Sequence, residues 1–225
     1  MRLPSTCWCM ALGIVTLAAC SRDQPAAPGL HSITGNVRMT GSLVNVDGHF
    51  AGTRVLDDVD GVPVELLHGR DVVARTTTAN GAYRFSGLSP GDYVARSRVI
   101  GDFGDQTDPM VIAAADVAAG TLQLTSGGDL LPAPNPFADS IRVFFTVNAP
   151  AQVEVGILDV GGNAVKNLLS LELQPARYGL IWNGRDQTGR PVTGSLFWVT
   201  YVAGDDIRAH LLFKGTPAPR RAASR

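Results

Sequence analysis

The chain has 225 residues, with 19 basic and 20 acidic side chains and a formal net charge of −1 at pH 7. This balance leaves no basic excess to bind a phosphate backbone, so we expect no nucleic-acid partner. The 25 glycines and 14 prolines, in a chain that is 45% hydrophobic, favour a globular protein with many turns and few long helices.

Residues 1–19 have the pattern of an export signal. Arg2 gives a positive start, and residues 8–19 form a nearly uninterrupted apolar stretch. That stretch is shorter than the roughly 20 residues of a spanning helix and suits a signal-peptide core. The run LAAC at 17–20 resembles the lipobox of bacterial lipoproteins, which implies that Cys20 is acylated and begins the mature chain. The alternative is an ordinary signal with a chance cysteine.

The lipobox resemblance implies a palmitate-type lipid on Cys20 that anchors the protein to a membrane of the cell envelope. Each buried CH₂ of an acyl chain contributes about 0.8 kcal/mol to such an anchor. Ser21, where an aspartate would retain a lipoprotein at the inner membrane, favours the outer membrane. Cys7 and Cys9 would leave with the signal, so the mature chain would have no thiol for a disulfide or metal.

Composition divides the rest of the chain into strand-rich blocks and Pro/Gly-rich joints. We predict, in order, the lipidated cysteine and a tether at 20–30, a β-sandwich at 31–126, a linker at 127–134, a second β-sandwich at 135–215 and a disordered tail at 216–225. The fold class is therefore all-β, with two tandem sandwiches.

Short strand-like runs alternate with turn signals throughout the first block. Tyr83 and Phe85 share one face of a predicted strand and Arg84 takes the other, as in a half-buried strand. The pair Asn80–Gly81 just before it predicts a turn with positive φ. Six or seven such strands in under 100 residues indicate a sandwich.

The first block resembles the carboxypeptidase regulatory-like and collagen-adhesin B-type families, which share a transthyretin-like sandwich. The matching residues are Gly61, Pro63, Val64, Leu66, Thr77, Gly81, Tyr83, Phe85, Leu88, Pro90, Gly91 and Tyr93. The resemblance implies a scaffold role for them and no catalysis. The Lys–Asn isopeptide bond of some adhesin relatives is excluded in this block, because the only lysines are Lys166 and Lys214.

The second block resembles the immunoglobulin-like domain of the flagellar hook-capping protein, a module also found at the C-termini of secreted bacterial proteins. The matching residues are Pro134, Asn135, Pro136, Phe137, Ile141, Val153, Val155, Asp159, Gly162, Val165, Trp182, Gly184, Asp186, Gly189, Val192 and Gly194. Asn183 and Phe197 depart mildly from the family pattern. Related modules act as secretion-sorting signals, but the lipobox and the longer tail count against that role here.

Candidate ligand groups are sparse. The four histidines, His31, His49, His68 and His210, have no metal-ligand spacing, and we expect them at surface or incidental positions. Asp57, Asp58 and Asp60 are weak calcium candidates, as are three aspartates at 102–108, because carboxylates before a tight turn suit Ca²⁺. Neither cluster matches the full calcium-binding loop, and a solvated loop is the simpler interpretation.

Two tryptophans in the second block bear on the choice of function. Trp182 lies at a family core position, and Trp198 lies in a strand, SLFWVTY, with apolar residues on both faces. Such a strand is buried on both sides or faces a partner. A carbohydrate-binding surface would instead need both rings to be exposed.

No nucleophile, general base and orienting group can be assembled from any local motif, so we predict no enzyme and no cofactor. The prediction is a lipid-anchored, non-catalytic envelope protein that acts as a binding or structural module. Its partner is the membrane, through the lipid on Cys20, and an unknown envelope protein or glycan. The alternatives are a carbohydrate-binding module and a cargo protein with a C-terminal secretion-sorting domain.

Overall fold

The structure, a computed structural model, describes residues 30–216. The predicted signal peptide, Cys20 and the tether up to residue 29 lie outside the described residues, as does the tail from residue 217. All regular elements in the described part of the chain are strands, which confirms the all-β prediction. Between residues 30 and 216, no helical segment has the length and hydropathy that a bilayer crossing requires.

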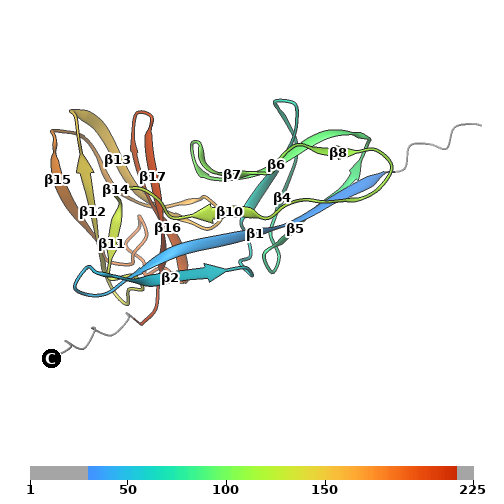
Figure 1. Cartoon of the computed structure of the whole chain (residues 1–225). Coiled ribbons are helices and arrows are strands. Elements are labelled where there is room, and N and C mark those ends of the chain that lie inside the picture. Colours follow the sequence, from blue (N-terminus) through green and yellow to red (C-terminus); the bar gives the residue numbers. More distant parts are fainter. Residues whose placement is uncertain (1–29, 217–225) are drawn as a thin grey trace, which may run out of the picture.

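The first sandwich consists of two sheets (Figure 1). Sheet I is built on the long strand β1 (His31–Val44), which pairs with β2 (Phe50–Leu56), β5 (Ala82–Leu88), β9 (Val117–Ala118) and β10 (Leu122–Thr125). Sheet II has the order β4 (Asp71–Thr77), β3 (Pro63–His68), β6 (Gly91–Ile100) and β7 (Phe103–Gln106), with β8 (Met110–Ile112) beside β6.

The second sandwich also has two sheets. Sheet III has the order β11 (Leu131–Ala133), β12 (Ile141–Val147) and β15 (Ala176–Trp182). Sheet IV has the order β14 (Ala164–Leu173), β13 (Ala151–Asp159), β16 (Leu196–Ala203) and β17 (Asp206–Phe213). All strand pairs in these two sheets are antiparallel, and β13–β14 and β16–β17 are hairpins of consecutive strands joined by short turns.

Local sequence sets the turns as predicted. Asn80 and Gly81 have φ values of 49° and 71°, and they reverse the chain between β4 and β5. Gly81 is also required sterically, because a Cβ there would lie 1.8 Å from the carbonyl oxygen of Asp57. At the next turn the Tyr93 hydroxyl donates a 3.0 Å hydrogen bond to the carbonyl of Ser89, which fixes the start of β6.

Sheet IV is a middle layer shared by both sandwiches. One of its faces packs on sheet III through Phe197, Val199, Tyr201 and Leu212, and the other packs into the first core through Trp198, Ala209, Leu211 and Phe213. The opposite faces of β16 and β17 are therefore both buried, as the alternating side chains of a strand allow. The Trp198 ring meets Phe103 of β7 edge-on, with ring centroids 6.2 Å apart.

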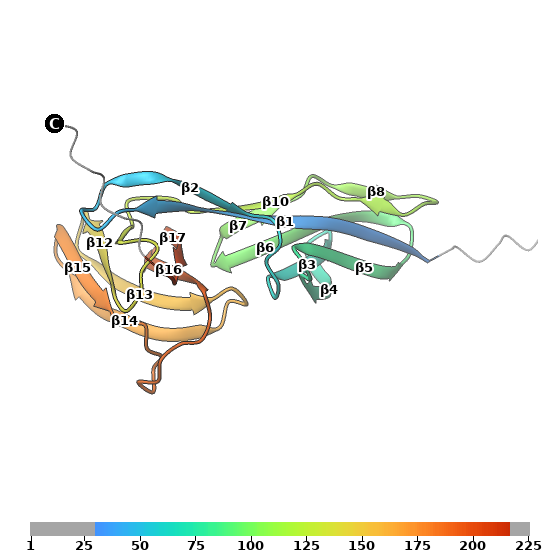
Figure 2. The same cartoon turned by 90° about the horizontal axis from the view of Figure 1, so that it is seen from below.

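The body is elongated, and β1 runs along its first half into the junction with the second (Figure 2). The described chain begins at the end of the first sandwich that is remote from sheets III and IV, and it ends near the start of β2, where β1 turns into β2 (Figures 1 and 2). The two described termini thus lie at opposite ends of the molecule.

Candidate functional site

The weak calcium candidates do not converge on one point. Asp57 accepts a hydrogen bond from the Arg38 guanidinium, and Asp60 accepts one from the backbone N–H of Asn80. Within residues 30–216, no group of three or more His, Cys, Asp or Glu side chains is placed to hold a metal ion. The aspartate loop at 102–108 is likewise occupied by protein contacts: Asp105 accepts hydrogen bonds from two backbone N–H groups.

Both tryptophans are buried, Trp182 at 1% exposure and Trp198 at 2%. The core position predicted for Trp182 is confirmed, and its indole N–H donates to the carbonyl of Arg185 at 2.8 Å. For the strand of Trp198 the sequence left two alternatives, burial on both sides or a face towards a partner, and the structure shows burial on both sides. Carbohydrate binding through these two rings is therefore contradicted.

The sequence placed His210 at a surface or incidental position. A surface position is wrong, because His210 is only 6% exposed. The physical reason is the middle-layer position of sheet IV, which buries both faces of β17. The sequence carried a signal for this in RAHLLF, where apolar residues occupy alternate and adjacent positions. That signal matches the one recognised in the neighbouring strand of Trp198.

A seam of residues 126–137 joins the two sandwiches, and it includes the segment expected as a linker. Gly127 N–H and Phe137 N–H donate to the carbonyls of Ala209 and Phe213 on the outer edge of β17. Ser126 Oγ accepts from Leu211 N–H at 2.8 Å. The seam therefore supplies hydrogen-bond partners to the edge of sheet IV, which would otherwise be left open.

Asn135 is the centre of this seam and is fully buried. Its Nδ2 donates to the carbonyls of Ser42 on β1 at 2.8 Å and Leu211 on β17 at 2.9 Å, and its Oδ1 accepts from Phe213 N–H at 2.8 Å. Its own backbone exchanges two hydrogen bonds with Val44. The sequence marked Asn135 only as part of a family motif, and its linking role depends on strand β1, which lies about ninety residues away.

Gly41 on β1 allows β1 and β17 to approach closely. A Cβ at this position would lie 2.7 Å from the Phe213 ring and 3.1 Å from the Cβ of Leu211. Neither contact could be relieved cheaply, because both partners belong to a packed core. The close packing of β1 on β17 therefore depends on Gly41, which leaves room for Phe213, and on the buried side-chain amide of Asn135, which bonds both strands.

A pocket of about 440 Å³ opens at this junction. It is bounded by the β1–β2 hairpin, the seam, and the adjoining parts of β12, β15 and β17. Phe50, Leu131 and Phe144 provide apolar wall, while Asp129 and Arg177 are its charged residues. The Arg177 guanidinium carbon lies 5.3 Å from the centroid of the Phe144 ring.

His210 is among the residues that line this junction pocket. Its Nε2 is buried without a hydrogen-bond partner. Burial lowers the pKa of His210 to about 4, and the backbone of Ser42 and Leu130 opposes this shift less strongly. The imidazole is therefore neutral at pH 7, and one of its nitrogens can accept or donate a hydrogen bond.

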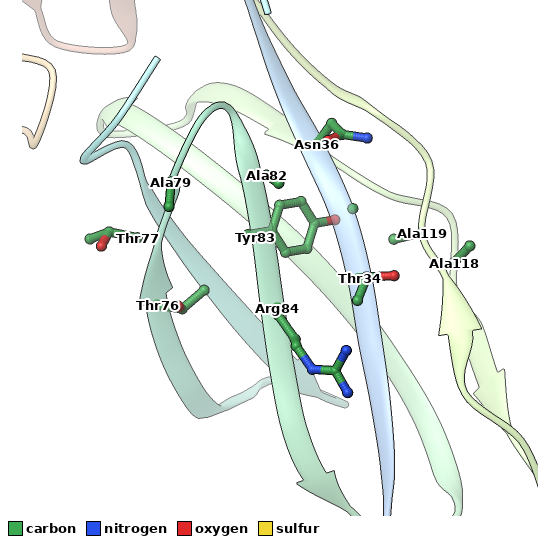
Figure 3. Close-up of a pocket in the computed structure, with 11 residues that line it drawn as sticks. Thr34, Asn36, Thr76, Thr77, Ala79, Ala82, Tyr83, Arg84, Ala118 and Ala119 are labelled. Atoms are coloured by element: carbon green, nitrogen blue, oxygen red, sulfur yellow. The ribbon is translucent and has the colours of Figure 1, made fainter. Parts of the chain in front are cut away.

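A second, more open groove of about 580 Å³ lies beside Tyr83 in the first sandwich (Figure 3). The Tyr83 ring extends from β5 towards β1, where a Cβ on Gly35 would lie 2.4 Å from its hydroxyl oxygen. Burial raises the pKa of Tyr83 to about 12. The lining is mostly Thr and Ala with Arg84, and it includes no carboxylate, so it offers fewer kinds of ligand contact than the junction pocket.

No protein-family model and no curated protein matches the sequence. Similar solved structures include a candidate carbohydrate-binding protein from Bacteroides uniformis, with 13% identity, TM-score 0.32, and coverage of 79% of this chain and 96% of that one. Dimeric latent PorU from Porphyromonas gingivalis has 14% identity, TM-score 0.31, and coverage of 72% and 18%. The major pilin SpaA of Corynebacterium diphtheriae has 12% identity, TM-score 0.30, and coverage of 87% and 65%. These values are too low to carry an argument about function.

Proposed function

We propose that the protein is a non-catalytic envelope protein, anchored by lipid on Cys20, that holds a binding surface away from the membrane. The observation that carries this proposal is the placement of the described termini at opposite ends of one continuous body (Figures 1 and 2). The lipobox, the outer-membrane location and the two family resemblances stay predictions from the sequence.

An anchor at Cys20 would place the first sandwich next to the bilayer. Leu30, where the described chain begins, lies ten residues along the chain from Cys20. Fully extended, they reach roughly 35 Å at most. The junction pocket and the second sandwich would then project outwards, and the shared middle layer would resist bending between the two sandwiches.

Membrane fractionation of the wild type beside Cys20→Ala tests the anchor, with Cys9→Ala as the matched control, since that cysteine would leave with the signal. We expect wild type and Cys9→Ala in the outer-membrane fraction with a diacylated mature N-terminus by mass spectrometry. The Cys20→Ala variant should be absent from the outer-membrane fraction and should carry no diacylated N-terminus. An unmodified N-terminus on a soluble wild-type protein would overturn the proposal.

A further inference from the structure

We propose that the junction pocket binds a neutral saccharide ring. The proposal rests on the chemistry of the residues around this pocket and is independent of the anchor at Cys20, so the two can fail separately. It also uses none of the tryptophans that the sequence suggested for this role.

The charges at the pocket select a neutral ligand. Asp129 and Arg177 bring one negative and one positive charge to its lining. The nearby Arg208 is held in an ion pair with Asp206, which leaves it little capacity to attract an anion. An anionic ligand would be attracted by Arg177 but repelled by Asp129. A cationic ligand would be attracted by Asp129 but repelled by Arg177.

The apolar wall suits the C–H face of a sugar. Phe50 stands 68% exposed on the edge strand β2, and Leu131 and Phe144 lie next to each other across β11 and β12. Large exposed aromatic side chains are costly to leave in water and are typical of binding surfaces. A pyranose ring has an apolar face of matching size and a rim of hydroxyls, so it can use both parts of the pocket.

The polar groups suit the hydroxyl rim. Asp129 can accept hydrogen bonds from two adjacent hydroxyls, and the guanidinium of Arg177 can donate to their oxygens. His210 also lines the pocket, but its Nε2 is buried from solvent, so its ring serves as a reporter of the pocket and not as a contact for the ligand. The pocket volume of about 440 Å³ is in the range of small-molecule sites.

NMR on the full-length chain with ¹³C-labelled histidine tests the proposal. The chain has four histidines, so the ring Cε1–H spectrum is sparse, and His210→Gln assigns the signal of interest. The probes are cellobiose, maltose, chitobiose and galactose, with galacturonate and tri-alanine as an anionic sugar and a peptide, each titrated to tens of millimolar. His31 and His68, in the first sandwich, serve as internal references.

We expect at least one neutral sugar to shift the His210 signal saturably while the reference signals stay in place. Phe50→Ala and Asp129→Asn, both at exposed positions, should weaken binding by about tenfold or more. Val55→Ala, at another exposed residue of β2 that lies outside the pocket, should bind as the wild type does. The proposal is overturned if none of the four neutral sugars shifts the signal, if Phe50→Ala binds normally, or if only galacturonate or the peptide shifts it.

Discussion

Replacing Asn135 by alanine should destabilise the protein more than any exposed substitution. The change removes three side-chain hydrogen bonds at a fully buried site and leaves the Leu211 carbonyl and the Phe213 N–H without their side-chain partner. Each lost bond has a net value of about 1 kcal/mol, and each stranded buried group costs about 1–3 kcal/mol. We expect a loss of about 4 kcal/mol in the free energy of unfolding, a large share of the roughly 5–15 kcal/mol of a typical domain.

Guanidinium denaturation followed by circular dichroism measures this loss. Asn163→Ala is the matched control, because the Asn163 amide also bonds a neighbouring group, Asp159, but lies at the exposed surface. It should cost less than about 1 kcal/mol. Asn135→Asp should be at least as destabilising as Asn135→Ala, since a carboxylate cannot donate to two carbonyls. If Asn135→Ala costs no more than Asn163→Ala, the reasoning about the seam is refuted.

Three further perturbations test other parts of the structure by the same denaturation assay. His210 has a pKa of about 4 in the folded state and 6.5 unfolded, so the unfolded state takes up protons first as the pH falls. Stability should be complete above pH 6.5 and fall by about 2 kcal/mol by about pH 5. His210→Gln should flatten this slope, and an unchanged slope would contradict the assignment. Gly41→Ala should cost about 1–3 kcal/mol through overpacking at β17, whereas Gly120→Ala, with open space around it, should be nearly neutral. Gly81→Ala should cost clearly more than Gly189→Ala, because both have positive φ but only the first meets backbone atoms; equal costs would show that the close contact is absent.

The local patterns of this sequence were sufficient to predict the strands and several turns. Tyr83 and Phe85 are buried on one face of β5 as their spacing indicated, and the Asn80–Gly81 turn has positive φ at both residues. These features depend on neighbours a few residues apart, where side-chain alternation and steric limits on φ act directly. The burial of Trp198 followed in the same way from apolar residues on both faces of its strand, whereas the core position of Trp182 was implied by the family resemblance.

The joining of the sandwiches could not be predicted from such patterns. The segment 127–134 looked like a linker because glycine and proline break regular structure, yet those residues lie along the edge of β17 and β11 forms within them. Asn135, which follows this segment, pairs with Ser42 on β1, 93 residues away, and nothing local encodes that pairing. The same long-range packing buries His210, which was expected at a surface or incidental position, and creates the junction pocket, which the sequence did not predict.

The claim that the two sandwiches form one body through a shared middle layer is tested most directly by differential scanning calorimetry of the full-length chain. We predict a single transition whose calorimetric and van't Hoff enthalpies agree, because sheet IV belongs to both cores. The Asn135→Ala variant should lower the temperature of that one transition. Two separate transitions in the wild type, one of them unmoved by Asn135→Ala, would contradict the claim and leave the sandwiches as independent domains.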